Sequence, residues 1–160
     1  MDHQLEEFLL ATKRCTEHLR DMIPQEKEKY QALISDDTQQ IEEMVQNQQA
    51  AIMKLKSLEA ARLHAQEQAG FAERSAEEIL ELVGDSDKTA VAETFRELRN
   101  AAKELRMCNA KAMEIARASA AFHQSNSPKA PTPMPAKVTY GAKGNAPGKI
   151  GNGSLFQIKI

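Results

Sequence analysis

Residues 5–23 read LEEFLLATKRCTEHLRDMI, and their apolar and small side chains recur in alternating steps of four and three. Side chains spaced in this way lie on one face of an α-helix, so the stretch predicts an amphipathic helix. The same phase continues beyond residue 23, and the full stripe consists of Leu5, Leu9, Thr12, Thr16, Leu19, Ile23, Glu26, Tyr30 and Leu33. Pro24 lies inside this stripe. Because the phase runs on past the proline, we expect a bend in the helix and not its end.

A second long helix is predicted to follow a short capping segment. Residues 35–38 read SDDT, four successive residue types whose side-chain oxygens can cap the first amides of a helix. The stripe that follows spans residues 41–69 and stops at Gly70. With its capping turn such a helix has about 32 residues, and at ~1.5 Å per residue it extends for roughly 48 Å, which suits an elongated bundle.

The next segment predicts a short helix and then another long one. Residues 75–78, SAEE, have the form of a capping box, and Gly84 is placed to end the short helix in a left-handed conformation. Residues 85–87, DSD, can cap a last helix whose stripe spans residues 91–119. The sequence therefore predicts an all-α fold, an elongated antiparallel bundle or coiled coil of three long helices plus one short helix.

Composition divides the chain at residue 123. Residues 1–123 hold all 23 acidic residues and 16 of the 21 basic ones, a net charge of −7, whereas residues 124–160 hold five lysines and no acid. Five of the seven glycines and five of the six prolines also lie in residues 124–160. Such a composition opposes helix and favours a flexible chain. We therefore expect a helical bundle domain over residues 1–123 and a disordered C-terminal tail over residues 124–160.

Two apolar islands interrupt the predicted tail, at Val138–Tyr140 and at Leu155–Ile160. Disordered chains usually lack such residues, so the islands either anchor a partner or pack back on the bundle. We favour anchoring, because a tail that folds on binding pays its ordering entropy at that moment and is easily released. Easy release is what hand-over from one partner to another requires.

No constellation of catalytic or metal-binding residues can be assembled from the sequence. The four histidines are scattered, with no HExxH pair and no zinc-like spacing, and no glycine-rich phosphate loop is placed between a strand and a helix. His18 lies one turn from Asp21, and we expect it to be a solvated surface residue. Cys15 and Cys108 are too few for a disulfide framework, and neither neighbours an activating histidine. We expect no enzyme activity, no cofactor and no metal.

Membrane insertion and nucleic-acid binding are also disfavoured. The first residues lack the basic and apolar regions of a signal peptide, and no apolar run approaches the ~18–20 residues that span a bilayer. The tail lysines are dilute and include no arginine, while the acidic bundle would repel a polyanion. These features predict a soluble protein of a reducing compartment, whose modest apolar stripes can take a helix from another protein.

One run of residues carries a family resemblance. It reads EKYQAL at residues 28–33 and DD at residues 36–37, and continues from Ile41 to KLKSLEAAR at residues 54–62. This pattern resembles the FlgN family of flagellar export chaperones, and in layout the resemblance covers residues 5–122. The segment VTYGAKG at residues 138–144 is similar to the tail motif of these chaperones, a tyrosine followed by a short polar run that contains glycine.

The resemblance implies a small helical cytoplasmic chaperone. Proteins of this family bind the C-terminal helical segments of the hook-associated proteins FlgK and FlgL, keep them from associating early, and deliver them to the export apparatus. In the family a tail tyrosine engages the export-gate protein FlhA, and by position this docking role falls to Tyr140. The C-terminal region of these chaperones takes part in substrate binding. The residues that we expect to form the substrate face lie on the last helix and are Leu105, Ala112, Ile115, Ala116, Ser119 and Phe122.

A structural coiled-coil adaptor or a homo-oligomer is the alternative interpretation. Heptad-like spacing suits self-association as well as it suits binding of a foreign helix. As a chaperone, the chain is expected to be a monomer or a weak dimer, so its oligomeric state separates the two interpretations.

Overall fold

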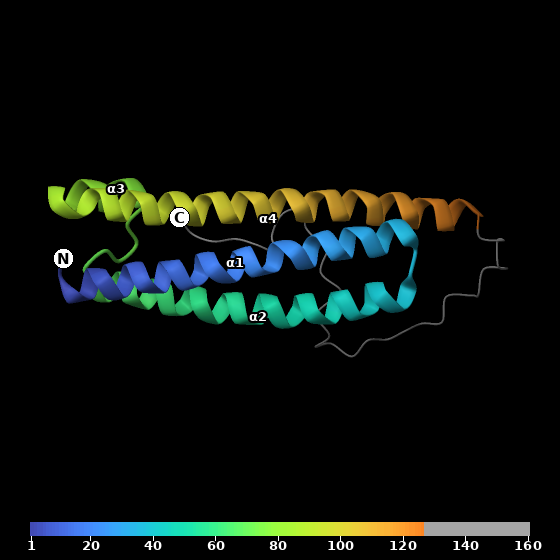
Figure 1. Ribbon diagram of the computed structural model, residues 1–160, viewed down its shortest axis with the longest axis horizontal. Coiled ribbons are helices and arrows are strands. Elements are labelled where there is room, and N and C mark those ends of the chain that lie inside the picture. Colours follow the sequence, from blue (N-terminus) through green and yellow to red (C-terminus); the bar gives the residue numbers. More distant parts are fainter. Residues whose placement is uncertain (127–160) are drawn as a thin grey trace, which may run out of the picture.

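The protein forms one elongated body of helices in a computed structural model that describes residues 1–126 (Figure 1). The described elements are α1 (His3–Ser35), α2 (Thr38–Gln68), α3 (Ala76–Leu82) and α4 (Asp85–Asn126). The predicted all-α fold of three long helices and one short helix is therefore confirmed. At ~1.5 Å per residue, α4 alone extends for roughly 63 Å.

The predicted boundary at residue 123 lies inside α4, which continues to Asn126. Two polar side chains extend the helix, because Ser125 Oγ donates to the carbonyl of Ala121 and Asn126 Nδ2 donates to that of Phe122, each at 3.0 Å. The remainder of the predicted tail, including both apolar islands, lies outside the described residues.

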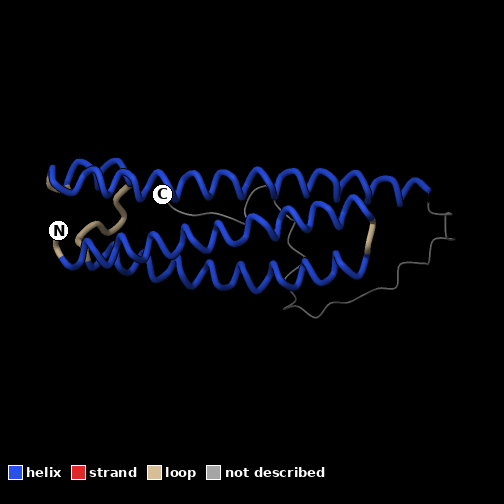
Figure 2. Tube along the Cα trace, in the orientation of Figure 1, coloured by secondary structure: helices blue, strands red, loops and turns tan. Residues whose placement is uncertain are grey.

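The three long helices run up, down and up, with α1 between the other two (Figure 2). α1 and α4 are parallel, since polar contacts join them in the same chain order. Arg20 pairs with Glu97 at 3.3 Å and Lys27 with Glu104 at 4.0 Å. Among residues 1–126, α1 packs against both α2 and α4, but no Cα atom of α2 lies within 8 Å of a Cα atom of α4. The two outer helices are held together through α1.

A two-residue turn reverses the chain between α1 and α2. Asp36 adopts a left-handed conformation (φ 55°), which lets its amide and that of Asp37 reach back to carbonyls of the last turn of α1. Asp37 is the N-cap of α2, and its side chain accepts a hydrogen bond from the amide of Gln40 at 3.1 Å. α1 continues through Pro24 without interruption, as the phase of its stripe predicts.

The capping box of α3 is confirmed, but the predicted role of Gly84 is wrong. Ser75 Oγ accepts from the amide of Glu78, and the carboxylate of Glu78 accepts from the amide of Ser75. Gly84 has no positive φ, because extended Val83 already turns the chain after α3. The carbonyl of Gly84 accepts from the amides of Asp87 and Lys88, so this glycine starts α4. The aspartates at 85 and 87 consequently lie in the first turn of α4, where acidic side chains favour the helix N-terminus.

Two apolar clusters form the core of the described residues, and we call the region that contains their buried members the sealed half: residues 5–23, 51–68, 76–83 and 85–105. In one cluster Phe8 packs edge-on against Phe95, with ring centroids 5.9 Å apart, and is also in contact distance of Phe71. α3 closes this cluster with Ile79. In the other, residues of all three long helices meet around Leu19 and Leu105, which are fully buried.

Polar residues inside the core stripe of α1 satisfy their own hydrogen bonds. Thr12 Oγ1 donates to the carbonyl of Phe8 at 2.8 Å, and Thr16 Oγ1 donates to that of Thr12 at 3.1 Å. Both hydroxyl groups can therefore be buried without an unmet donor.

The prediction that His18 is a solvated surface residue is wrong. Its side chain is buried, and Nε2 lies 2.8 Å from the backbone carbonyl oxygen of Ala51 on α2. Since a carbonyl oxygen only accepts, Nε2 carries the proton and donates. Near neighbours along α1 could not indicate this partner, because it comes from the adjacent helix.

Replacement of Leu105 by alanine tests the core. Leu105 is 0% exposed, so Leu105→Ala is expected to lower the free energy of unfolding by ~2–5 kcal/mol through lost burial and the cavity left behind. Met107 lies two residues further along the same helix and is 54% exposed, so Met107→Ala is the matched control and should cost less than about 0.5 kcal/mol. Urea unfolding followed by circular dichroism measures both. Equal losses in the two variants would contradict the burial of Leu105.

Burial raises the pKa of the Cys15 thiol from 9.0 to about 11, with a further contribution from the nearby carboxylate of Glu59, while Arg62 opposes the shift. The folded state keeps the thiol neutral, whereas the unfolded state ionises it above its ordinary pKa of 9.0. The folded state therefore keeps its full stability below pH 9 and loses part of it as the pH rises toward 11. We expect the unfolding free energy of the wild type to fall between pH 9 and 11 more steeply than that of Cys15→Ala, by on the order of 2 kcal/mol. Urea titrations at several pH values check this, and parallel pH profiles would contradict it.

Candidate functional site

The end of the bundle farthest from α3 is poorly buried, and we call it the open end: residues 26–35 of α1, 38–50 of α2 and 106–126 of α4. None of residues 38–50 is buried. The buried side chains of this region are two charged residues and two alanines, namely Glu26, Lys29, Ala32 and Ala112. The three helices therefore bury almost no apolar side chain at this end.

Apolar side chains at the open end instead lie on its surface or are half-buried. The exposed ones are Ile34, Val45, Met107 and Phe122, and Phe122 is 64% exposed. The larger half-buried ones are Tyr30, Leu33, Ile41, Met44, Cys108, Met113 and Ile115. Exposed large apolar side chains also occur in the sealed half, at Leu10, Met53, Leu63 and Leu82, so the open end differs from it in lacking large buried apolar residues. Apolar surface that is left uncovered in this way is a candidate protein-binding site.

Four side chains of the open end lie at its border with the sealed half, and we call them the polar layer: Glu26, Lys29, Gln48 and Asn109. Lys29 Nζ donates to Glu26 Oε1 at 3.0 Å, to Gln48 Oε1 at 2.9 Å and to Asn109 Oδ1 at 3.5 Å. Gln48 Nε2 donates to Glu26 Oε1 at 2.6 Å. Glu26 Oε2 lies 2.8 Å from Lys29 Nζ but accepts no hydrogen bond. The layer links all three long helices through a buried ion pair.

A groove of ≈ 800 Å³ lies beside the polar layer and receives side chains from all three long helices. Tyr30, Cys108 and Ile115 supply apolar lining. Lys27 and Glu114 are among the charged side chains that line it. Apolar lining with charges of both signs suits an amphipathic helix better than a small anionic or cationic ligand.

The contact between Asp36 and His123 joins the far ends of the long helices. His123 Nε2 lies 3.3 Å from Asp36 Oδ2, and both side chains are exposed. Exposed ion pairs contribute little to stability, so this contact holds the end of α4 only weakly against the α1–α2 turn.

The six residues predicted for the substrate face lie in three environments. Leu105 and Ala112 are buried, and Leu105 belongs to the apolar cluster of the sealed half. Phe122 is exposed at the end of α4. The half-buried members are Ile115, Ala116 and Ser119. A partner can therefore reach the four residues from Ile115 onward directly, whereas Leu105 and Ala112 are covered.

The sequence interpretation missed the polar layer, although a signal for it was present. Glu26, Gln48 and Asn109 occupy stripe positions in three different helices, where apolar residues are expected. Since each stripe faces the other helices, one polar residue on each of the three stripes indicates that these side chains contact one another inside the bundle. Tyr140, the predicted docking residue, lies outside the described residues.

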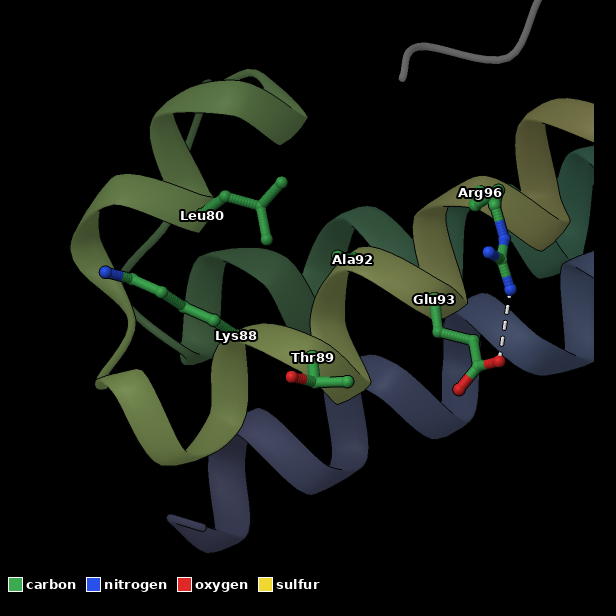
Figure 3. Close-up of a pocket in the computed structure, with 6 residues that line it drawn as sticks. All are labelled: Leu80, Lys88, Thr89, Ala92, Glu93 and Arg96. Carbon is green, nitrogen blue, oxygen red and sulfur yellow. Dashed lines mark hydrogen bonds and ion pairs between the residues drawn. The ribbon is translucent and has the colours of Figure 1, made fainter.

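A second hollow, of ≈ 470 Å³, lies at the opposite end of the molecule between α3 and α4 (Figure 3). Leu80 points from α3 toward α4 there. Lys88 pairs with Asp85 at 2.7 Å, and Arg96 pairs with Glu93 at 3.1 Å. Because these cations already have partners on their own helix, the hollow is a weaker candidate for a binding site than the groove at the open end.

No group of three or more histidine, cysteine, aspartate and glutamate side chains that could hold a metal ion occurs within residues 1–126. In the same part of the chain, no helix combines the length and the apolar character needed to cross a membrane. The candidate site is therefore defined by its apolar surface and its polar layer.

Comparison with known proteins gives one match. A family model described as FlgN protein matches residues 1–148, a range that contains the whole described bundle and Tyr140. No curated protein and no solved structure matches the chain.

Proposed function

Because the chain belongs to the FlgN family of flagellar export chaperones, we propose that it binds the C-terminal helical segments of the hook-associated proteins FlgK and FlgL. It masks these segments in the cytoplasm and delivers them to the export-gate protein FlhA. The chain acts by binding alone and requires no catalytic residue.

The observation that carries the proposal is the unequal burial of the two ends of the bundle. At one end α3 covers Phe8 and Phe95 with Ile79, so the apolar side chains of three helices are sealed. At the open end no described element plays the role of α3, and Phe122 and Ile34 are exposed. A helix from a partner would supply there the cover that α3 supplies at the other end.

The groove at the open end fits the amphipathic character of such a partner. A helix laid along it would place its apolar face on Tyr30 and Ile115 and its polar face toward solvent. The charges that flank these residues, Lys27 and Glu114 among them, lie where they would select the direction of the bound helix. Half-buried side chains change their exposure little on binding, which favours a moderate and reversible affinity.

Delivery requires a second contact, and Tyr140 is the proposed residue for it. In the family resemblance a tail tyrosine engages FlhA, and the matched range of the family model includes residue 140. Binding of substrate through the bundle and of FlhA through a separate segment would let one chain hold both partners at once. The chaperone would be a monomer or a weak dimer.

Substitution of two residues at the open end tests the substrate site. Ile115→Ser with Phe122→Ser is expected to weaken binding of a FlgK or FlgL C-terminal segment by about tenfold or more, since apolar contacts are lost. Leu82→Ser is the matched control. Leu82 is 59% exposed, close to the 64% of Phe122, but it lies on α3 at the other end of the bundle. Isothermal titration calorimetry measures the affinities, and circular dichroism checks the fold.

Two outcomes would contradict the proposed function. One is the absence of binding by the wild type to either segment at micromolar concentration. The other is a stable dimer, seen by light scattering before any partner is added, in which the open end is buried between two copies. The second outcome would support the alternative of a homo-oligomerising coiled-coil protein.

Replacement of Tyr140 separates delivery from substrate binding. Tyr140→Ala is expected to leave the unfolding free energy and the affinity for FlgK unchanged, while binding to the cytoplasmic part of FlhA falls by about tenfold or more. Tyr140→Phe keeps the ring and reports whether the hydroxyl group contributes. Pull-down with FlhA and a motility assay measure the effect, and normal export by Tyr140→Ala would refute the docking role.

A further inference from the structure

Lys29 is a point at which all three long helices are joined. Its ammonium group donates to Glu26 on α1, to Gln48 on α2 and to Asn109 on α4. Nowhere along residues 1–126 does a Cα atom of α2 lie within 8 Å of a Cα atom of α4, so the two outer helices meet through side chains alone. The contacts of one buried lysine therefore couple the two outer helices at the border of the open end.

Burial changes abruptly at this border. On the sealed side the apolar core reaches Ile23, Ala51 and Leu105. On the open side only Ala32 and Ala112 are buried apolar residues. Separation of α4 from α1 at the open end would expose two buried alanines and the covered parts of half-buried side chains such as Tyr30 and Ile115, whereas separation beyond the polar layer would expose fully buried leucines. The free energy of opening is consequently low up to the polar layer and rises steeply past it.

The polar layer itself contributes little net free energy to the association of the helices. Glu26 and Lys29 are buried charges, and the desolvation of such a pair offsets much of its attraction. Glu26 Oε2 has only the ammonium group of Lys29, at 2.8 Å, as a partner for its buried charge. Opening would return both groups to water. Pro24, two residues before Glu26, also leaves the carbonyl of Arg20 without its helical donor.

We propose that the polar layer is a latch: residues 109–126 of α4 separate from α1 as one unit when Lys29 releases Asn109, while the sealed half stays packed. The inference rests on the proposed function for its biological role, since the opened state is the one that a partner helix would occupy. It assigns Ala112 to the substrate surface, because opening uncovers it, and excludes Leu105, because Leu105 stays in the core. The substrate surface on α4 therefore begins at Asn109.

Hydrogen exchange on the full chain without any partner tests the latch, because a helical segment of this length is only marginally stable once it has separated from α1, and its amides then exchange. The amides of residues 110–120 are expected to exchange together, with protection factors lower by about tenfold or more than those of residues 95–105. A gradual decline of protection from residue 105 to the end of the helix would indicate ordinary fraying and would overturn the proposal.

Two variants of the ion pair are expected to act in opposite directions. Lys29→Met leaves the Glu26 carboxylate buried without its cation, so protection of residues 110–120 should fall by about tenfold or more. Glu26→Leu with Lys29→Met replaces the pair by apolar side chains, so protection of the same residues should rise by about tenfold. A fall in the double variant, or no change in it, would overturn the latch even if the single variant did not fold.

The exposed pair Lys27–Glu104 provides the matched control. It joins α1 and α4 close to the polar layer. Lys27 Nζ lies 4.0 Å from Glu104 Oε1, and both side chains are exposed. Lys27→Met with Glu104→Leu is expected to leave the protection of residues 110–120 unchanged within about twofold. A rise equal to that of the buried double variant would show that added apolar surface, and not the latch, is the cause.

Binding measurements connect the latch to the proposed function. If only the opened state binds, the affinity of the buried double variant for a FlgK C-terminal segment should fall by the same factor by which its protection rises. An unchanged affinity would overturn the role of opening in binding. If the wild type binds neither FlgK nor FlgL, the proposed function fails, and exchange on the free chain still decides whether the latch exists.

Discussion

The packing of α2 and α4 on opposite flanks of α1 is the constraint on which the rest of the structure depends. Because the outer helices do not contact each other through their backbones, each is stabilised by the face that it shares with α1. This explains why the buried stripe of α1 is the widest of the three. Phe8, Cys15 and Met22 are buried in addition to the residues of the stripe that begins at Leu5. It also explains why α2 buries only four of its residues, namely Ala51, Leu55, Arg62 and Gln66. The central helix makes the bundle, and the outer helices are free to differ along their length.

The two ends of the bundle use this freedom differently. At the sealed half Arg62 forms two hydrogen bonds with Glu59 and one with Gln66, and Gln66 donates in turn to the carbonyls of Phe71 and Arg74. This chain of contacts fixes the loop that brings α3 over the aromatic cluster. At the open end the polar residues point inward to one another, and within residues 1–126 no further element covers the apolar side chains there. Each end contains one buried cation. Arg62 in the sealed half helps to hold α3 over the core, whereas Lys29 bonds within the polar layer and leaves the open end accessible.

The sequence predicted the number, order and capping of the helices because these depend on local chemistry. The step of three and four along α1, the box formed by Ser75 and Glu78, and the aspartates before α2 act within a few residues of the chain. The errors concern Gly84 and His18, whose roles depend on a preceding extended residue and on a carbonyl of another helix. The polar layer could be suspected from its residue types, yet its assembly depends on the register between helices. Periodicity within one helix contains no information on that register, which is also why the covered and uncovered members of the predicted substrate face could not be separated.

The polar layer can be understood as a compromise between two demands on a chaperone of this family. An apolar layer would extend the core toward Ala112 and hold α4 closed. If only the opened state binds, as we propose, the apparent affinity for a partner helix would then fall by the same factor as the opened population. Without any layer, α2 and α4 would have no common contact beyond Ala51 and Leu105, and a partner would have to pay the entropy of ordering both. A buried ion pair avoids both extremes, since it specifies one arrangement of three helices while adding little to its stability. The small side chains of Ala32 and Ala112 serve the same end, because they let the helices lie close together without creating apolar burial that a partner would have to replace.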